Sequence, residues 1–193
     1  MNYEKLEKQL KKKLDDSRYT HTLGVAYTCT CLAMRYNYDI ERAYLAGLLH
    51  DCAKCIDNDK KIELCEKNHI EITEIERKNP FLLHAKLGSL HAKKKYHIQD
   101  EEILSAIRWH TTGHPDMTML EKIVFVADYI EPNRKKQPNL TEVRHLCFEN
   151  LDQGLKRILS DTLVYLNSKK DPIDEMTQMT YDYYNEKDGN KNE

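Results

Sequence analysis

Apolar residues along this chain recur at intervals of three and four, the spacing of one face of an α-helix. Strand-like alternation of apolar and polar residues is absent. The stretch "DDS" at 15–17 supplies capping side chains, Pro80 suits a first helical turn, and Pro132 disfavours helix before it. The pattern predicts helices over residues 3–14, 18–35, 40–50, 60–68, 80–96, 100–110, 117–130, 141–166 (interrupted around 150–153) and 173–186.

Helix-breaking residues are sparse, with six glycines and five prolines in 193 residues, and we find neither an internal repeat nor a linker. This length and pattern indicate one domain that can bury a core of its own. We expect an all-α fold, a single-domain helical bundle over residues 1–186. The core would cover about residues 15–170, followed by a C-terminal helical segment at 171–186 and a disordered tail at 187–193.

Charge and hydropathy narrow the class of protein. Lys and Arg total 30 against 32 Asp and Glu, and a net charge of −2 argues against a nucleic-acid partner, which normally needs a strong basic excess. No apolar run approaches the roughly 20 residues of a membrane span. The N-terminal stretch lacks the apolar centre of a signal peptide. We therefore expect a cytoplasmic protein without membrane contact.

Six cysteines are expected to be free thiols, because the cytoplasm is reducing. Two of them form "CAKC" at 52–55, a spacing that can bind zinc or do redox chemistry. A single pair without a second CxxC is weak evidence for either, and buried cysteine is a common small core residue. We favour packing for this pair.

An apolar helix ends on two groups that bind metals: "LAGLLHDCAK" at 45–54 runs into His50 and Asp51. His21 follows Arg18 by three positions and shares its helical face. Asp128 lies in the apolar stretch "EKIVFVADYIEP", where an unpaired carboxylate would be costly. Neutral imidazoles and a carboxylate together suit a divalent transition metal. Two further candidates, each on a helix of its own, are His84 and His110.

Several of these candidate residues also have a simpler interpretation that involves no metal. A lone His84 or His110 is more often a hydrogen-bonded core histidine, and Asp128 could merely pair with Arg134 or act as a cap. For His91 we favour packing or support of a neighbouring site residue. Charged surroundings favour the surface for His69, His97 and His145.

The order of these groups resembles the HD-domain metal-dependent phosphohydrolases. More specifically, "RYTHTLGVA", "AGLLHDCAK", "HAKLGS", "AIRWHTTG" and "LEKIVFVADYIEPNR" are similar to the signature segments of the YqeK family, bacterial symmetrical diadenosine tetraphosphate hydrolases. The resemblance spans about residues 15–185. It implies an HD-type helical bundle and a homodimer. It also implies cleavage of the dinucleoside tetraphosphate into two ADP by water whose pKa a metal lowers toward ~7.

The resemblance also implies roles for single residues. The metal, iron in this family and present as one ion or two, would be held by His21, His50, Asp51 and Asp128. Ligand softness alone does not separate iron, manganese, nickel and zinc. Catalysis would involve Asp51, His84 and His110. The nucleotide would be contacted by Arg18, Asp51, Lys54, His84, His110, Asp128, Arg134, Asp171, Pro172, Ile173, Asp174, Glu175 and Met176.

Two other functions remain open at this point. One is an HD phosphohydrolase that acts on other nucleotides. The other is a nucleotide-sensing or interaction protein with slow turnover, in which the basic stretch "NRKK" at 133–136 contacts RNA or a partner. We favour a solvated loop for that stretch, because the chain is nearly neutral. The complete set of metal-binding groups favours an enzyme.

Overall fold

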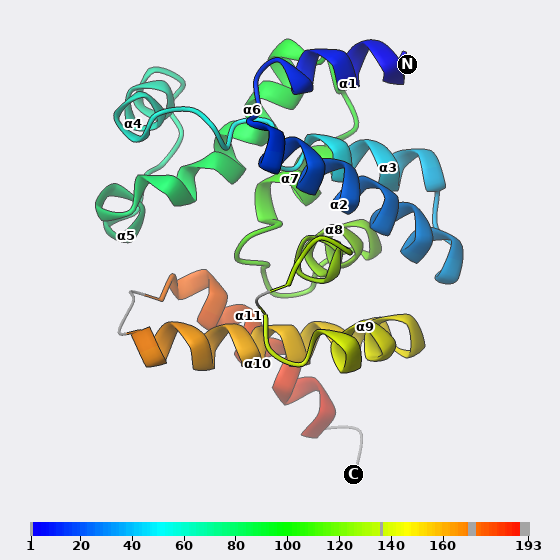
Figure 1. Ribbon diagram of the computed structural model, residues 1–193. Helices are drawn as coiled ribbons and strands as arrows, with labels where there is room; N and C mark the ends of the chain where they lie inside the picture. Colours follow the sequence, from blue (N-terminus) through cyan, green and yellow to red (C-terminus); the bar gives the residue numbers. More distant parts are fainter. Residues whose placement is uncertain (1, 136, 170–172, 190–193) are drawn as a thin grey trace.

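The computed structural model describes residues 2–135, 137–169 and 173–189, and all regular structure within them is helical (Figure 1). This confirms the predicted all-α class. The elements are α1 (Tyr3–Lys11), α2 (Asp16–Arg35), α3 (Ile40–Leu49), α4 (Asn58–Lys67), α5 (Glu74–Lys78), the 3-10 helix η1 (Pro80–Leu83), α6 (His84–Lys95), α7 (Glu101–Trp109), α8 (Met119–Ile130), α9 (Leu140–Glu149), α10 (Leu151–Lys169) and α11 (Glu175–Gly189).

Side-chain caps decide where two of the central helices begin. The Asp15 carboxylate accepts a hydrogen bond from the backbone N–H of Arg18 at 2.8 Å, so the predicted cap at 15–17 is present and α2 starts just before Arg18. Thr118 and Glu121 form a capping box at the start of α8, in which each side chain accepts from the other residue's backbone N–H.

The helices α2, α3, α7 and α8 enclose the main core, with α8 at its centre (Figure 1). Nearly all apolar side chains of α8 are buried. Gly47 lets α3 approach α2, because a Cβ there would lie 2.9 Å from Cα of Ala26. This close approach brings the end of α3 against the middle of α2, so that the rings of His21 and His50 lie 5.4 Å apart between centroids.

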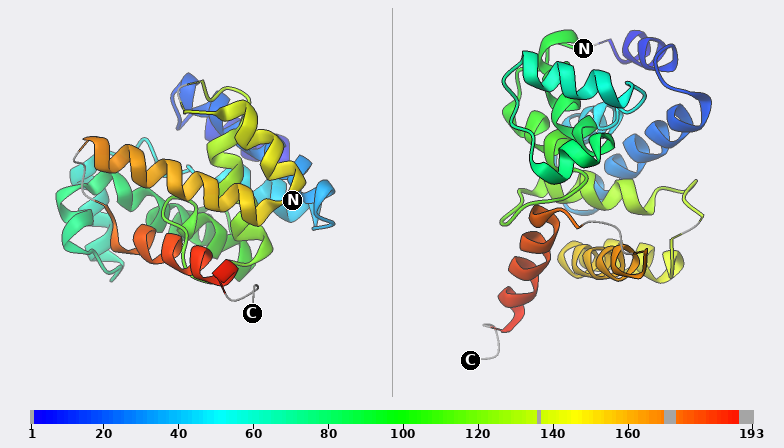
Figure 2. Two further views of the ribbon diagram at one scale, coloured as in Figure 1. Left: turned by 90° about the horizontal axis from the view of Figure 1, so that it is seen from below. Right: turned by 90° about the vertical axis from the view of Figure 1, so that its left-hand side faces the viewer.

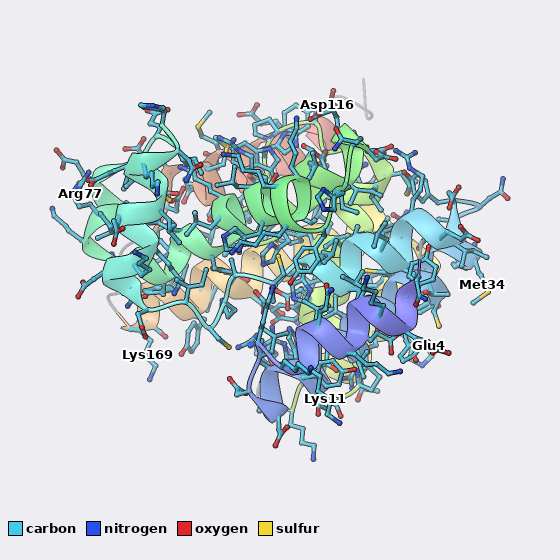
Figure 3. The ribbon with its side chains drawn as sticks, turned by 90° about the horizontal axis from the view of Figure 1, so that it is seen from above. Glu4, Lys11, Met34, Arg77, Asp116 and Lys169 are labelled. Atoms are coloured by element: carbon cyan, nitrogen blue, oxygen red, sulfur yellow. The ribbon has the colours of Figure 1, made fainter. Side chains whose placement is uncertain are left out.

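The three C-terminal helices form a second layer below α8 (Figures 1 and 2). Asn150, with an extended backbone, separates α9 from α10, as the predicted interruption around 150–153 requires. The helix α11 packs on α10 and on the loop between α7 and α8. In that loop, the backbone N–H of Met117 donates to the Tyr184 hydroxyl at 2.9 Å, and the Tyr183 hydroxyl donates to Asp116 at 2.8 Å. Figure 3 shows Asp116 beside this last helix.

Some predicted boundaries are wrong. The short helix α5 was not predicted, because "EIERK" has too few apolar residues to show a period; Thr73 and Glu76 form its capping box. The predicted helix at 80–96 divides into η1 and α6. The last helix continues to Gly189, three residues into the predicted disordered tail, while residues 171, 172 and 190–193 lie outside the described part of the chain.

The cysteines are free, as predicted, and the two in "CAKC" differ from each other. Cys52 is buried, and its thiol donates to the carbonyl of Gly88 at 3.5 Å. Cys55 is exposed, and its thiol donates to Asp15 at 3.5 Å. Packing is therefore confirmed for Cys52 and is wrong for Cys55. Neither thiol belongs to a potential metal-binding group among the described residues.

Among the described helices, none has both the length and the apolar character needed to cross a membrane.

Candidate metal centre

Six potential metal ligands from five different helices or helix ends meet against α8. His21 comes from α2, His84 begins α6, and Asp128 lies in α8. The other three follow the ends of α3 and α7. All are buried except Asp128, whose side chain is 23% exposed. The cluster therefore contains His21, His50, Asp51, His84, His110 and Asp128, the ligands and catalytic residues that the sequence predicts.

One half of the cluster lies around Oδ2 of Asp51 and Oδ1 of Asp128. His21 Nε2 is 2.9 Å from Asp128 Oδ1 and 3.9 Å from Asp51 Oδ2. His50 Nε2 is 3.4 Å from Asp51 Oδ2 and 3.8 Å from Asp128 Oδ1. These are the four residues predicted to hold one metal ion.

The other half lies around Oδ1 of Asp51. His84 Nε2 is 3.2 Å and His110 Nε2 is 3.6 Å from this oxygen, and the two nitrogens are 3.1 Å apart. The Thr111 hydroxyl lies 3.2 Å from His110 Nε2 and 3.4 Å from His84 Nε2. Asp51 thus faces both halves, with one carboxylate oxygen in each.

Backbone contacts orient three of the imidazoles. In His50, His84 and His110, Nδ1 donates to the carbonyl three residues earlier, at 2.6, 2.6 and 2.7 Å. A neutral ring that donates from Nδ1 presents a lone pair at Nε2. Around Oδ1 of Asp51, lone pairs therefore face one another at short range, which is repulsive unless a cation lies between them.

The residues fit a divalent metal. Three groups have ligand atoms within 4.8 Å of one another: His21, His50 and Asp51; His50, His110 and Asp128; and Asp51, His84 and His110. Within the described chain, His21 Nε2, His50 Nε2 and Asp51 Oδ1 are buried and lack a well-oriented hydrogen bond. Buried polar atoms are nearly always satisfied, so these atoms point to a missing ligand.

Two arginines and a lysine surround the ligands. Arg18 donates to Oδ2 of Asp51 and Arg134 to Oδ1 of Asp128, each at 2.7 Å. Lys54 Nζ is 3.1 Å from His84 Nε2 and 4.0 Å from Asp51 Oδ1. The predicted partner of Asp128, Arg134, is present, but Asp128 contacts His21 as well.

Burial and charge shift the pKa values in opposite directions. Burial opposes ionisation of Asp51, but the imidazoles of His50 and His110 outweigh it and hold the pKa of Asp51 well below 3.8. Burial lowers the pKa of His84 to about 4, so this ring is neutral at pH 7. Burial also lowers the pKa of Lys54, against the attraction of Asp51. The cluster is therefore anionic and rich in lone pairs, as a cation site must be.

Sequence reasoning missed Glu131, which supports His21 from behind. Its Oε1 lies 3.1 Å from His21 Nδ1, and its Oε2 accepts from the backbone and side-chain N–H groups of Asn133 at 2.7 and 3.1 Å. Gly24 leaves room for this carboxylate, because a Cβ there would overlap Oε2. Glu131 directly precedes Pro132, which in the sequence indicates only a helix end, and a carboxylate beside a proline gives no signal of its own.

Two hollows open beside the cluster. The first, the Trp109 hollow, has a volume of about 180 Å³ and is lined by Thr111, whose hydroxyl contacts His84 and His110. Its wall also includes Asp174 and Met176. The second, the Arg134 hollow, has a volume of about 610 Å³ and is lined by Arg18, His21 and Arg134.

Only some of the C-terminal residues predicted to contact the nucleotide line a hollow near the cluster. Glu175 lines a neighbouring hollow of about 380 Å³ together with Asp174. Ile173 is half-buried and lines none of these hollows. Asp171 and Pro172 lie outside the described residues.

The remaining histidines lie outside the cluster. His69, His97 and His145 are exposed, as predicted. His91 is buried, and its Nδ1 lies 3.3 Å from Lys95 Nζ.

Comparison with known proteins agrees with this geometry. Residues 18–133 match the HD domain family. The symmetrical bis(5'-nucleosyl)-tetraphosphatase of Bacillus subtilis is 38% identical over 95% of this chain and 97% of its own length. Its counterpart in Halalkalibacterium halodurans is 39% identical, over 94% and 96%.

A solved structure from Clostridium acetobutylicum, described as a predicted HD superfamily hydrolase involved in NAD metabolism, superimposes with a TM-score of 0.93. It shares 38% sequence identity and covers 97% of this chain and 98% of its own. The resemblance found in the sequence is thereby confirmed, and this chain belongs to the HD domain family.

Proposed function

We propose that this protein is a metal-dependent phosphohydrolase that cleaves diadenosine tetraphosphate symmetrically to two ADP. The observation that carries the proposal is the convergence of buried lone pairs around Asp51, ringed by cationic side chains. An anionic ligand set binds the metal, and the surrounding cations suit a polyphosphate. Full-length relatives at 38–39% identity are named for this activity.

We assign the metal to His21, His50, Asp51 and Asp128, and propose iron on the strength of the family resemblance. Once bound, such an ion lowers the pKa of water toward ~7 and neutralises phosphate oxygens. The lone pairs of His84 and His110, together with Oδ1 of Asp51, fit a second ion.

The protein's own cations bind the phosphate chain in this proposal. Arg18 and Arg134 are 27% and 29% exposed, so each guanidinium can pair with its carboxylate and still reach phosphate oxygens. Lys54 adds a third cation at the histidine side. These groups hold the tetraphosphate in line for attack and stabilise the charge that moves to the leaving ADP.

Asp51 and Asp128 both lie at the centre and, in the proposal, contact the nucleotide as well as the metal. Asp51 is ionised, because its pKa is held well below 3.8. The same low pKa makes it a weak base, so in the proposal one of its oxygens relays the proton of the attacking water to solvent without keeping it. His84 and His110 border the leaving phosphate.

The C-terminal segment would complete the nucleotide site. Asp174 and Met176 line the Trp109 hollow, and Glu175 lines the one beside it. We extend the assignment to Asp171, Pro172 and Ile173 by the family resemblance alone. Hydrogen exchange across 173–184 with and without ADP tests it: slower exchange with ADP is expected, and identical exchange would remove the segment from the site.

The same resemblance leads us to propose a homodimer in the cytoplasm. Sedimentation of the purified protein at micromolar concentration tests the oligomeric state, and a monomer would contradict the proposal.

Product analysis tests the function. Metal-stripped protein should be inactive on diadenosine tetraphosphate, and protein reloaded with Fe²⁺ should release two ADP and nothing else. AMP plus ATP would identify an asymmetric enzyme. A reloaded protein that leaves this substrate intact but hydrolyses other nucleotides would support the wider HD phosphohydrolase alternative, and tight ADP binding without turnover would support a sensor.

A further inference from the structure

The two hollows lie beside different halves of the ligand cluster. In the Trp109 hollow, the Thr111 hydroxyl lies within 3.4 Å of His84 and His110, on the side of Asp51 Oδ1. The Arg134 hollow is lined by Arg18, whose guanidinium donates to Asp51 Oδ2. A chain of phosphates laid across Asp51 would therefore have one end in each hollow.

The walls of the two hollows differ in chemistry. The Trp109 hollow offers an indole, a thioether from Met176 and the hydrogen-bonding groups of Thr112 and Asp174, which suit the face and edge of a base. The Arg134 hollow is lined by three cations, Arg18, Arg134 and Lys135, by the carboxylates of Asp16 and Glu131, and by polar groups such as Asn133. No Trp, Tyr or Phe is among its described lining residues, so it suits phosphate and ribose but gives a base nothing to stack on.

Symmetrical cleavage requires the scissile bridge to lie two phosphates from each nucleoside. We propose that the Arg134 hollow is the subsite for the second nucleotide half of the substrate, which it holds by phosphate and ribose without reading the base. The first half places its base in the Trp109 hollow. This inference rests on the proposed function and assigns each half of the substrate to a hollow of its own.

The reaction balances with water alone. The water oxygen bonds to one central phosphorus as the bond from that phosphorus to the central bridging oxygen breaks. The bridging oxygen leaves with the other half as a nucleoside diphosphate, and the two protons of the water pass to solvent. Because the second base is not read, a mixed adenosine–guanosine tetraphosphate should be cleaved to ADP and GDP. Its kcat/KM should lie within about threefold of that for diadenosine tetraphosphate, since threefold is under 1 kcal/mol of discrimination.

Ser17 offers a clean test, because it is exposed, lines the Arg134 hollow and is the second residue of α2. Ser17→Trp should fill the hollow and lower kcat/KM for diadenosine tetraphosphate by about tenfold or more, the loss of at least one charge-assisted contact. ADP should still bind at the Trp109 hollow with its affinity unchanged. Thr141→Trp, at the exposed second residue of α9 and outside both hollows, is the matched control.

The reciprocal variant is Trp109→Ala. Removing the indole should weaken ADP binding by roughly tenfold, as expected for one base–aromatic stack.

The outcomes separate this inference from the function itself. Normal kcat/KM in Ser17→Trp, or equal loss of substrate turnover and ADP affinity, would overturn the second subsite. A guanosine penalty above about fiftyfold, more than 2 kcal/mol, would show that both bases are read. A reloaded wild-type protein that cleaves no dinucleoside tetraphosphate would overturn the proposed function and this inference together.

Discussion

Replacing Glu131 by Gln tests how the cluster is held in place. Glu131 is 1% exposed, and both of its carboxylate oxygens are engaged: Oε1 with His21 Nδ1 and Oε2 with two N–H groups of Asn133. Glutamine has the same shape but only one acceptor oxygen. When His21 donates from Nδ1, the tautomer that leaves Nε2 free for a metal, the NH₂ group faces an N–H donor in either orientation. The change therefore removes the charge behind His21 and one buried acceptor without creating a cavity.

Two magnitudes follow from this geometry. Leaving a buried donor unsatisfied costs ~1–3 kcal/mol, so the metal-free variant that keeps His21 in this tautomer should lose that much free energy of unfolding. A carboxylate behind a metal-binding histidine fixes its tautomer and raises its basicity, and its loss typically costs ~10–100-fold in metal affinity. We expect both effects in Glu131→Gln.

Urea unfolding of metal-free protein and anaerobic titration with Fe²⁺ measure the two quantities separately. Glu149→Gln, an exposed change at the end of α9, is the control and should alter neither. An iron affinity within twofold of wild type, with stability lowered as expected, would refute the reasoning. Glu131 would then serve only to hold the chain around Asn133.

The remaining predictions concern the cluster and one histidine outside it. Asp51→Asn removes a charge shared by both halves, so bound metal should fall and turnover should drop by orders of magnitude while circular dichroism stays helical; near-normal turnover would exclude the metal assignment. Arg18→Ala and Arg134→Ala should keep the metal, measured by elemental analysis, but lower kcat/KM for diadenosine tetraphosphate about tenfold or more, because a charged hydrogen bond is worth ~1.5–3 kcal/mol. Metal loss with an intact affinity for diadenosine tetraphosphate would reverse the assigned roles. Burial, aided by Lys95, lowers the pKa of His91 from 6.5 to about 4, so the folded state binds fewer protons than the unfolded state in that interval. The stability that the neutral ring provides is complete above pH 6.5 and is lost as the pH falls toward 4. Urea unfolding across this range should show a shallower fall in His91→Gln than in wild type, and identical curves would assign the dependence to other groups.

Most helices and most candidate site residues of this protein can be predicted from its sequence, because the patterns that indicate them are local. Apolar spacing of three and four residues identifies most helices, since each helix must bury one stripe. Capping residues mark their starts, as Asp15 does for α2. The "HD" pair and the histidines on separate helices stand out because a buried charge or imidazole needs a partner. The family resemblance then assigned roles that spacing alone could not.

The helix predictions that were wrong also have local causes. The helix α5 has no apolar period, and α11 runs further than its polar residues suggested. By their spacing in the sequence, Ile173, Met176, Met179 or Thr180, and Tyr183 fall on one stripe of the last helix. Among the side chains of this helix that the structure describes, Thr177, Thr180 and Tyr184 are the buried ones. The Tyr184 hydroxyl, which accepts from the backbone N–H of Met117, fixes this side of the helix against the loop between α7 and α8.

Only the tertiary structure decided what the site can do. Asp51 presents one carboxylate oxygen to each half of the cluster. This arrangement depends on the packing of α2, α3, α6, α7 and α8 against one another. The support of His21 by Glu131 joins residues 110 positions apart. The lone pairs at Nε2 depend on turns that direct Nδ1 to a carbonyl. Sequence determines which groups are available, whereas distances between helices determine which of them face the same ion, and those distances arise from the packing of the whole core.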